Sequence, residues 1–257
     1  MCPLLTPDSN IVYHQTPMTT AAEAPYYGRI GSGQREDITW EWIPVSPVIL
    51  VSDQWVLCSA WAVEYIGSDK VLFVGLGGTF TPPYNPDEIY GVTAKHMHPL
   101  YNGSYSYVYN DIALLRLDRE VTFTAKIIPA CLHTGTPLPD SGFTLTSWYG
   151  STVYKTTLRR VSQEECSRVF PASWYRPAGV KHDVEICSRP VNKTGGCPGW
   201  SRGASLTLPN SPRVACTHLL VGLASWDTSP CAYTNTRVTA FIPWIEGIVW
   251  PESGVVV

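Results

Sequence analysis

Charged residues are scarce in this 257-residue sequence: Asp, Glu, Lys and Arg together make up 15%, and the net charge is −3. So few charges argue against a coiled coil or a helical bundle, which need charged outer faces. Because there is no positive excess, the composition does not indicate a surface for nucleic acid or an anionic membrane. Apolar runs such as residues 48–51 are far below the ~20 residues that cross a bilayer, so no membrane span is expected.

Signals for targeting and for metal binding are also missing. The first ten residues are neither basic nor apolar enough to form a signal peptide. No C-x-x-C pair occurs, and no cluster of Cys and His has the spacing of zinc ligands. We therefore expect no metal and no cofactor.

Glycine, proline and aromatic residues are plentiful, with 20 Gly, 22 Pro, 10 Trp and 14 Tyr. Short apolar runs recur from residue 39 onward between Gly and Pro clusters, which is typical of a sandwich or barrel of short strands. The polar, Pro-rich residues 134–142 indicate a linker between two strand-rich halves. A helix is predicted near the end, with Thr239 as N-cap and Pro243 in its first turn. Its apolar face would consist of Phe241, Trp244, Ile245, Ile248 and Val249.

Eight cysteines and two glycosylation sequons favour an extracellular protein. The sequons begin at Asn102 and Asn192. Without metal-ligand spacing, so many cysteines are best explained by disulfides formed in an oxidising compartment. We expect a secreted protein, and the missing signal peptide then indicates a processed or truncated product.

Three segments resemble the chymotrypsin-like serine protease family. Residues 53–62 (DQWVLCSAWA) are similar to its W-V-L-T-A-A-H-C segment, residues 110–117 (NDIALLRL) to N-D-I-A-L-L-x-L, and residues 197–204 (CPGWSRGA) to C-x-G-D-S-G-G-P. Shorter matches stand in the family's order at residues 98–101, 129–132, 147–150, 222–226 and 236–238. The resemblance implies an all-β fold: two six-stranded antiparallel β-barrels with a C-terminal α-helix.

The resemblance also suggests how the chain is divided. Residues 1–28 are expected to be a loosely structured N-terminal leader or linker, tethered by Cys2. The protease-like domain would cover residues 29–257. Within it, the first barrel would lie at about residues 30–132, the second at about 143–238 and the helix at about 240–250.

The catalytic positions that the resemblance implies are filled in part by unsuitable residues. Ser201 stands at the nucleophile position and Asp111 at the carboxylate that orients the base, but Trp61 stands at the base position. An indole N–H only donates, so Trp61 cannot take a proton from Ser201. Of the six histidines, only His96 and His98 are even distant candidates to line the site; the others are His14, His133, His182 and His218.

The oxyanion hole and the partner of the new N-terminus after activation cleavage also depart from the family pattern. By resemblance, the backbone amides of Gly199 and Ser201 are the oxyanion donors, and bulky side chains surround them at Trp200 and Arg202. Trp200 also replaces the Asp that pairs with the new N-terminus after activation cleavage. The bond between Arg29 and Ile30 is a candidate for that cleavage, and the alternative is an ordinary exposed arginine.

The substrate pocket implied by the resemblance has no charge to select a basic side chain. Gly195 occupies the floor position, where trypsin-like members carry Asp. Ser225 and Trp226 would line the pocket. Tyr233 falls near a wall position that needs Gly, so its ring is expected to fill the space.

The family's disulfides account for six of the cysteines. The implied pairs are Cys2–Cys131, Cys166–Cys187 and Cys197–Cys231. Two cysteines have no family partner: Cys58 and Cys216 either bridge each other or remain buried free thiols.

These changes together predict a secreted, catalytically inactive serine protease homologue, a pseudoenzyme that acts by binding a protein. It would be a cofactor, decoy or regulator in an extracellular protease cascade, for example in innate immunity, and its partner would be a protease or another cascade component. Trp61, Trp200 and Tyr233 either offer an aromatic contact surface or plug the old cleft. The alternatives are a residual or unconventional serine endopeptidase or hydrolase using Ser201, and a small-ligand or glycan-binding module.

Overall fold

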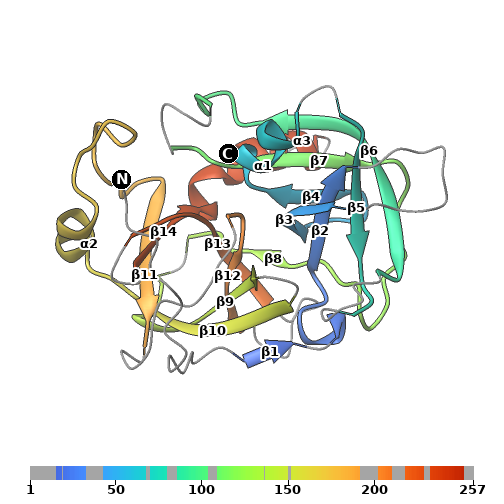
Figure 1. Ribbon diagram of the computed structural model, residues 1–257, viewed down its shortest axis with the longest axis horizontal. Helices are drawn as coiled ribbons and strands as arrows, with labels where there is room; N and C mark the ends of the chain where they lie inside the picture. The colour runs from blue at the N-terminus through green and yellow to red at the C-terminus, as the bar shows by residue number, and fades with distance from the viewer. Residues whose placement is uncertain are drawn as a thin grey trace.

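Two six-stranded antiparallel β-barrels and a C-terminal helix make up the fold (Figure 1), as predicted. The computed structural model describes residues 16–18, 20–32, 43–67, 70–79, 86–103, 109–135, 137–149, 152–191, 202–209, 218–228 and 232–251. Among these residues, no helix is long and apolar enough to cross a membrane.

The first barrel closes on itself in the order β2-β3-β4-β7-β6-β5. Its strands are β2 (Tyr27–Ser32), β3 (Ile43–Leu50), β4 (Trp55–Cys58), β5 (Leu72–Leu76), β6 (Glu88–Met97) and β7 (Ala113–Leu117). Alternate residues point inward, so Val48, Leu50, Val56, Val74 and Leu115 fill the interior. Helix α1 (Ala60–Ile66) begins two residues after β4 ends.

The second barrel is closed because β9 pairs with both β10 and β12. Its strands are β9 (Ser141–Tyr149), β10 (Thr152–Arg160), β11 (Glu185–Pro190), β12 (Ser205–Pro209), β13 (His218–Thr228) and β14 (Ala232–Arg237). Two short strands attach to it: β1 (Thr16–Met18) pairs with β10, and β8 (Cys131–Leu132) runs parallel to β13. Helix α2 (Gln163–Val169) connects β10 to β11.

The N-terminal segment is more ordered than expected. Within the predicted leader, β1 and the 3-10 helix η1 (Ala21–Glu23) precede β2, which already begins at Tyr27. Met18, Tyr26 and Tyr27 are at most 1% exposed and pack with side chains of both barrels. Isolated apolar residues without a period gave no signal in the sequence, yet here they fill the space between the barrels. The remaining residues of the leader, including Cys2, lie outside the described residues.

The C-terminal helix is confirmed, but its start differs from the prediction. The 3-10 helix η2 (Val238–Phe241) leads into α3 (Ile242–Val249), whose N-cap is Phe241 and not Thr239. The Thr239 hydroxyl lies 3.0 Å from the carbonyl of His133 and 2.6 Å from its Nδ1, so it fastens the β8 region instead of capping the helix. The predicted apolar face packs where the two barrels meet.

Arg29 lies in β2, a strand of the first barrel, and its side chain is buried. It is 1% exposed, in a strand paired on one side with β3 and on the other with β5, and its guanidinium lies 4.5 Å from the Trp148 ring centroid. It is therefore not the exposed arginine that one interpretation expected. A protease could reach the bond between Arg29 and Ile30 only if this barrel opened.

A buried ion pair holds the segment between α2 and β11 in place. Arg176 Nη1 lies 2.6 Å from Glu185 Oε1, and Nη2 donates to Thr234 in β14. Tyr109, two residues before Asp111, donates to the carbonyl of Gly179 in the same segment at 2.7 Å. Burial raises the pKa of the Glu185 carboxyl, while the Arg176 charge acts in the opposite direction. The pair thus fixes the segment to which Tyr109 connects the loop that carries Asp111.

We expect Glu185→Leu to lower the free energy of unfolding by about 3–5 kcal/mol, because it leaves the Arg176 cation buried without a counter-charge. The double variant, Arg176→Met with Glu185→Leu, should lower the free energy of unfolding by clearly less. Urea denaturation of the two variants and the wild type measures the difference. If both variants lost the same free energy of unfolding, the buried Arg176 cation would not need a counter-charge.

Candidate functional site

Asp111 is the centre of the candidate site. It lies directly before Ile112 and β7, after a turn in which Asn110 has a positive φ of 54°, a conformation that Asn adopts more readily than most residues. Its side chain is 1% exposed. A carboxylate at this depth needs a hydrogen-bond donor or a cation for each oxygen.

Both barrels supply those partners. Oδ1 accepts hydrogen bonds from the Ser59 hydroxyl at 2.6 Å and from the Trp61 backbone N–H at 2.9 Å, both at the start of α1. Oδ2 accepts from the Ser225 hydroxyl of β13 at 3.3 Å and lies 3.3 Å from Arg202 Nε. Three hydrogen-bond donors and one cation therefore surround the two oxygens, which is close to the full capacity of a carboxylate.

Arg202 is held firmly in this arrangement. Its side chain is 12% exposed, and Nε donates its hydrogen to the carbonyl of Ser225 at 2.8 Å, while its charge lies beside Asp111. The Ser46 hydroxyl donates to the Arg202 carbonyl at 2.9 Å. The next residue, Gly203, has a φ of +83°, and a Cβ there would lie 2.9 Å from Ser46 Oγ, so only glycine suits the turn.

Trp61 lies beside Arg202. The Arg202 guanidinium carbon is 5.0 Å from the Trp61 ring centroid, within the range of a cation–π contact. The Trp61 ring also stacks on Tyr65, one turn further along α1, with centroids 4.9 Å apart. An indole beside a guanidinium provides no proton acceptor, because both groups only donate.

The imidazoles described in the structure make their contacts at other places. The His96 ring packs near Trp55 and the His98 ring against α3, so neither distant candidate is directed at Asp111 by these contacts. The other three described histidines contact Thr239, Ser167 and Tyr26, respectively: His133, His182 and His218. His14 lies outside the described residues.

Several predicted site residues lie outside the described part of the chain. They are Gly195, Gly199, Trp200, Ser201 and the side chain of Trp226. Ser225, predicted to line the pocket, directs its hydroxyl at Asp111. Tyr233 is 0% exposed and packs with Phe143, Leu145 and Ala224 inside the second barrel. Tyr233 is therefore too deep to contact a partner.

The predicted cysteines and sequons are described only in part. A disulfide joins Cys166 to Cys187, and Cys131 is also disulfide-bonded. Cys58 is a free and fully buried thiol, so of the two interpretations the unbridged one applies to it. Asn102 is exposed. Outside the described residues lie Cys2, Cys197, Cys216, Cys231 and Asn192.

Sequence reasoning missed two partners of Asp111. Ser59 carried no signal, since a small polar residue before a helix is ordinarily a cap. Arg202 was noted only as a bulky neighbour of the oxyanion donors. A signal did exist, because an arginine next to the nucleophile position brings a long cation within reach of a buried carboxylate.

The family model described as Trypsin matches residues 45–245. Melanization protease 1 of Drosophila melanogaster is 28% identical over 232 residues, which cover 78% of this chain and 57% of that protein. Phenoloxidase-activating factor 1 of Holotrichia diomphalia is 30% identical over 181 residues, 63% of this chain and 46% of its own. Inactive CLIP domain-containing serine protease A8 of Anopheles gambiae is 27% identical over 168 residues, 60% and 44% of the two chains. The chain thus spans about half the length of these relatives.

We expect Asp111→Asn to lower the free energy of unfolding by about 3–5 kcal/mol, because the Arg202 cation then stays largely buried without a counter-charge. Asp118→Asn is the matched control, since Asp118 pairs with Arg119 on the surface and should cost less than about 1 kcal/mol. Guanidinium denaturation compares the two. An Asp111→Asn variant as stable as the control would show that the Arg202 contact adds nothing to the fold.

Cys58 is expected to resist alkylation in the folded protein. Burial raises the pKa of its thiol, with a further contribution from the charge of Asp111, so little thiolate forms at pH 8. Iodoacetamide should modify Cys58 only in denaturant, as measured by mass spectrometry of its peptide. Rapid modification of the native protein would contradict the burial of this thiol.

Proposed function

The chain belongs to the trypsin family of serine proteases, and from this premise we propose that it is a secreted, catalytically inactive member that acts by binding another protein. The observation that carries the proposal is the ion pair between Arg202 and Asp111. In an active member of the family, one oxygen of that carboxylate orients a histidine.

Trp61 supports the loss of catalysis because it stands at the position that the resemblance assigns to the base. The serine hydroxyl is a weak nucleophile until a neighbouring group accepts its proton. Neither the indole of Trp61 nor the guanidinium of Arg202 accepts a proton at physiological pH. Loss of the base costs several powers of ten in rate.

Because of Arg202, placing a histidine at position 61 would not by itself restore a working base. Nε of Arg202 and the hydroxyl of Ser225 both contact Oδ2 of Asp111. An imidazole at position 61 would have to displace one of them before Asp111 could orient it. The nearby guanidinium would also oppose the positive charge that the imidazole acquires when it takes the proton.

The buried ring of Tyr233 supports the same proposal from the substrate side. The resemblance places Tyr233 where a pocket wall needs glycine, and its side chain is enclosed among barrel residues. The ring belongs to the core of the second barrel, so it supports the proposal as a bulky residue at a position where the resemblance expects glycine.

Secretion and the type of partner are inferred from the disulfides and the relatives. Disulfides such as Cys166–Cys187 persist in oxidising compartments. The relatives include proteins named for melanization and phenoloxidase activation, and one named as inactive. We infer a cofactor, decoy or regulatory role in an extracellular protease cascade of this kind, with a protease or another cascade component as partner.

The absence of a working nucleophile can be tested with a biotinylated fluorophosphonate, which labels activated serines. We expect no label on Ser201 under conditions that label trypsin fully. Trp61→His alone should also remain unlabelled, because Arg202 still holds Oδ2. Adding Arg202→Gly to Trp61→His frees that oxygen, so the double variant should label faster than the single one.

The alternative, a residual or unconventional serine hydrolase, predicts the opposite result. Label on wild-type Ser201, identified by peptide mass spectrometry and lost in Ser201→Ala, would overturn the proposed inactivity. Circular dichroism of each variant checks that its fold is retained.

A further inference from the structure

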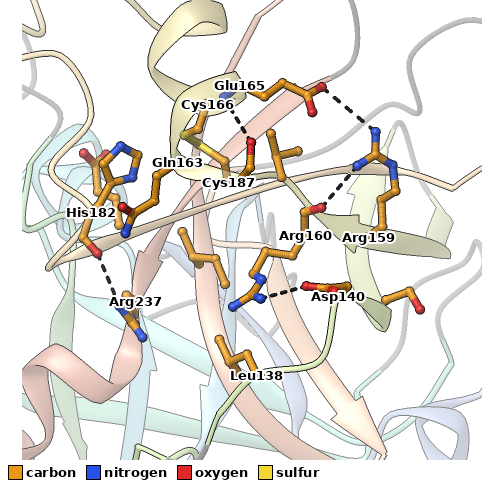
Figure 2. Close-up of a pocket in the computed structure, with 15 residues that line it drawn as sticks. Leu138, Asp140, Arg159, Arg160, Gln163, Glu165, Cys166, His182, Cys187 and Arg237 are labelled. Atoms are coloured by element: carbon orange, nitrogen blue, oxygen red, sulfur yellow. Dashed lines mark hydrogen bonds and ion pairs between the residues drawn. A yellow bond between two sulfur atoms is a disulfide. The ribbon is translucent and has the colours of Figure 1, made fainter.

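We propose that a hollow on the second barrel binds an organic anion, a carboxylate or sulfonate carried on an apolar body. The hollow has a volume of about 730 Å³, within the roughly 300–1,000 Å³ of typical ligand sites. It lies between the end of β10, the start of α2 and the adjoining ends of β11 and β14 (Figure 2). None of the residues that contact Asp111 lines it, so the site is separate from the catalytic remnant.

Guanidinium groups outnumber carboxylates around this hollow. Three arginines line it, and two more pair with its carboxylates from outside: Arg159, Arg160 and Arg237, with Arg176 and Arg189. Only three carboxylates line it: Asp140, Glu165 and Glu185. Glu185 is committed to the buried Arg176, and Glu165 is shared between Arg189 and Arg159. The balance leaves a positive region that an anion would neutralise.

Arg237 is the arginine lining the hollow that has no carboxylate partner among the described residues. Its Nη1 donates to the backbone carbonyl of His182 at 3.2 Å, and no carboxylate among the described residues pairs with it. Its Nε is buried and has no hydrogen-bond partner in the described part of the chain. A half-buried guanidinium whose bonded neighbour is a neutral carbonyl gains strongly from an anionic ligand.

Arg160 can be recruited to the same ligand. Its Nη2 lies 2.7 Å from Asp140 Oδ1, but the Asp140 side chain is 91% exposed. Exposed pairs of this kind contribute little, about 0–1 kcal/mol, so a bound anion can replace Asp140 as the partner. Arg160, Arg237 and Leu138 all line the hollow, and Figure 2 shows the Arg160 side chain reaching Asp140 near Leu138. The two guanidinium groups and this apolar side chain therefore belong to one region.

The apolar part of the lining indicates an organic ligand rather than a bare ion. Leu138, Val161 and Ile186 line the hollow together with the disulfide between Cys166 and Cys187. An inorganic anion would contact the arginines but leave this surface in water. An aromatic or aliphatic body would cover it and add hydrophobic binding energy.

Calorimetric titration of the full chain with naphthalene-2-sulfonate tests the proposal, with inorganic sulfate and the neutral 2-naphthalenemethanol as comparison ligands. We expect the sulfonate to saturate one site and both comparison ligands to bind at least about tenfold more weakly. Arg237→Met and Arg160→Met should each weaken sulfonate binding by about tenfold or more. Asp140→Asn should strengthen it, because Arg160 loses its competing partner.

Arg168→Met is the matched control. Arg168 lies on α2, next to the hollow but outside its lining, with its side chain 71% exposed and paired with Glu164. This variant should bind the sulfonate like the wild type. Arg237→Lys keeps the charge if Arg237→Met misfolds, and it should lose less affinity than the Met variant.

Four outcomes would overturn the proposal. They are no saturable binding of the sulfonate, equal binding of the neutral alcohol, equal binding of sulfate, and equal losses in Arg168→Met and Arg237→Met. The titration does not depend on Ser201, so its result is independent of the proposed loss of catalysis.

Discussion

The contact between Arg202 and Asp111 is the interaction on which the rest of the site depends. A carboxylate that is 1% exposed needs compensation for lost hydration, and here a cation and three hydrogen-bond donors supply it. Ser59 and Trp61 come from the first barrel, whereas Arg202 and Ser225 come from the second. The charge that a protease would use to orient a histidine therefore holds the two barrels together.

Apolar and polar contacts on either side of Asp111 reinforce this link. One cluster combines the N-terminal segment, both barrels and α3, so that residues from the two ends of the described chain share a core. On the other side, Tyr109 bonds to the segment that the buried pair of Arg176 and Glu185 secures. Asp111 thus sits in a seam that is packed on both sides, and the geometry around it is set by the whole fold rather than by one loop.

The sequence was sufficient for the architecture but not for the contacts that define the site. Short apolar strands, three family-like segments and the helical period of the last residues predicted two barrels and α3, whereas the filling of a substrate pocket by Tyr233 stays a prediction. The burial of Arg29 was unpredictable, because its aromatic partner Trp148 lies far away in the sequence, in a strand of the other barrel. Ser59 and Arg202 were missed for a similar reason, since no local pattern reports which carboxylate a long or small polar side chain will meet.

Retention of Asp111 is therefore weak support for retained catalysis in this chain. Replacing Asp111 would leave Arg202 uncompensated whether or not Ser201 reacts, so stability alone is a reason to keep it. Gly203 also has a structural role, because its turn allows the Ser46 hydroxyl to donate to the Arg202 carbonyl. The residues that look most protease-like around Asp111 are those that the fold itself requires. At Trp61 and Tyr233, by contrast, the resemblance expects a histidine and a glycine, whose roles would be chemical rather than structural.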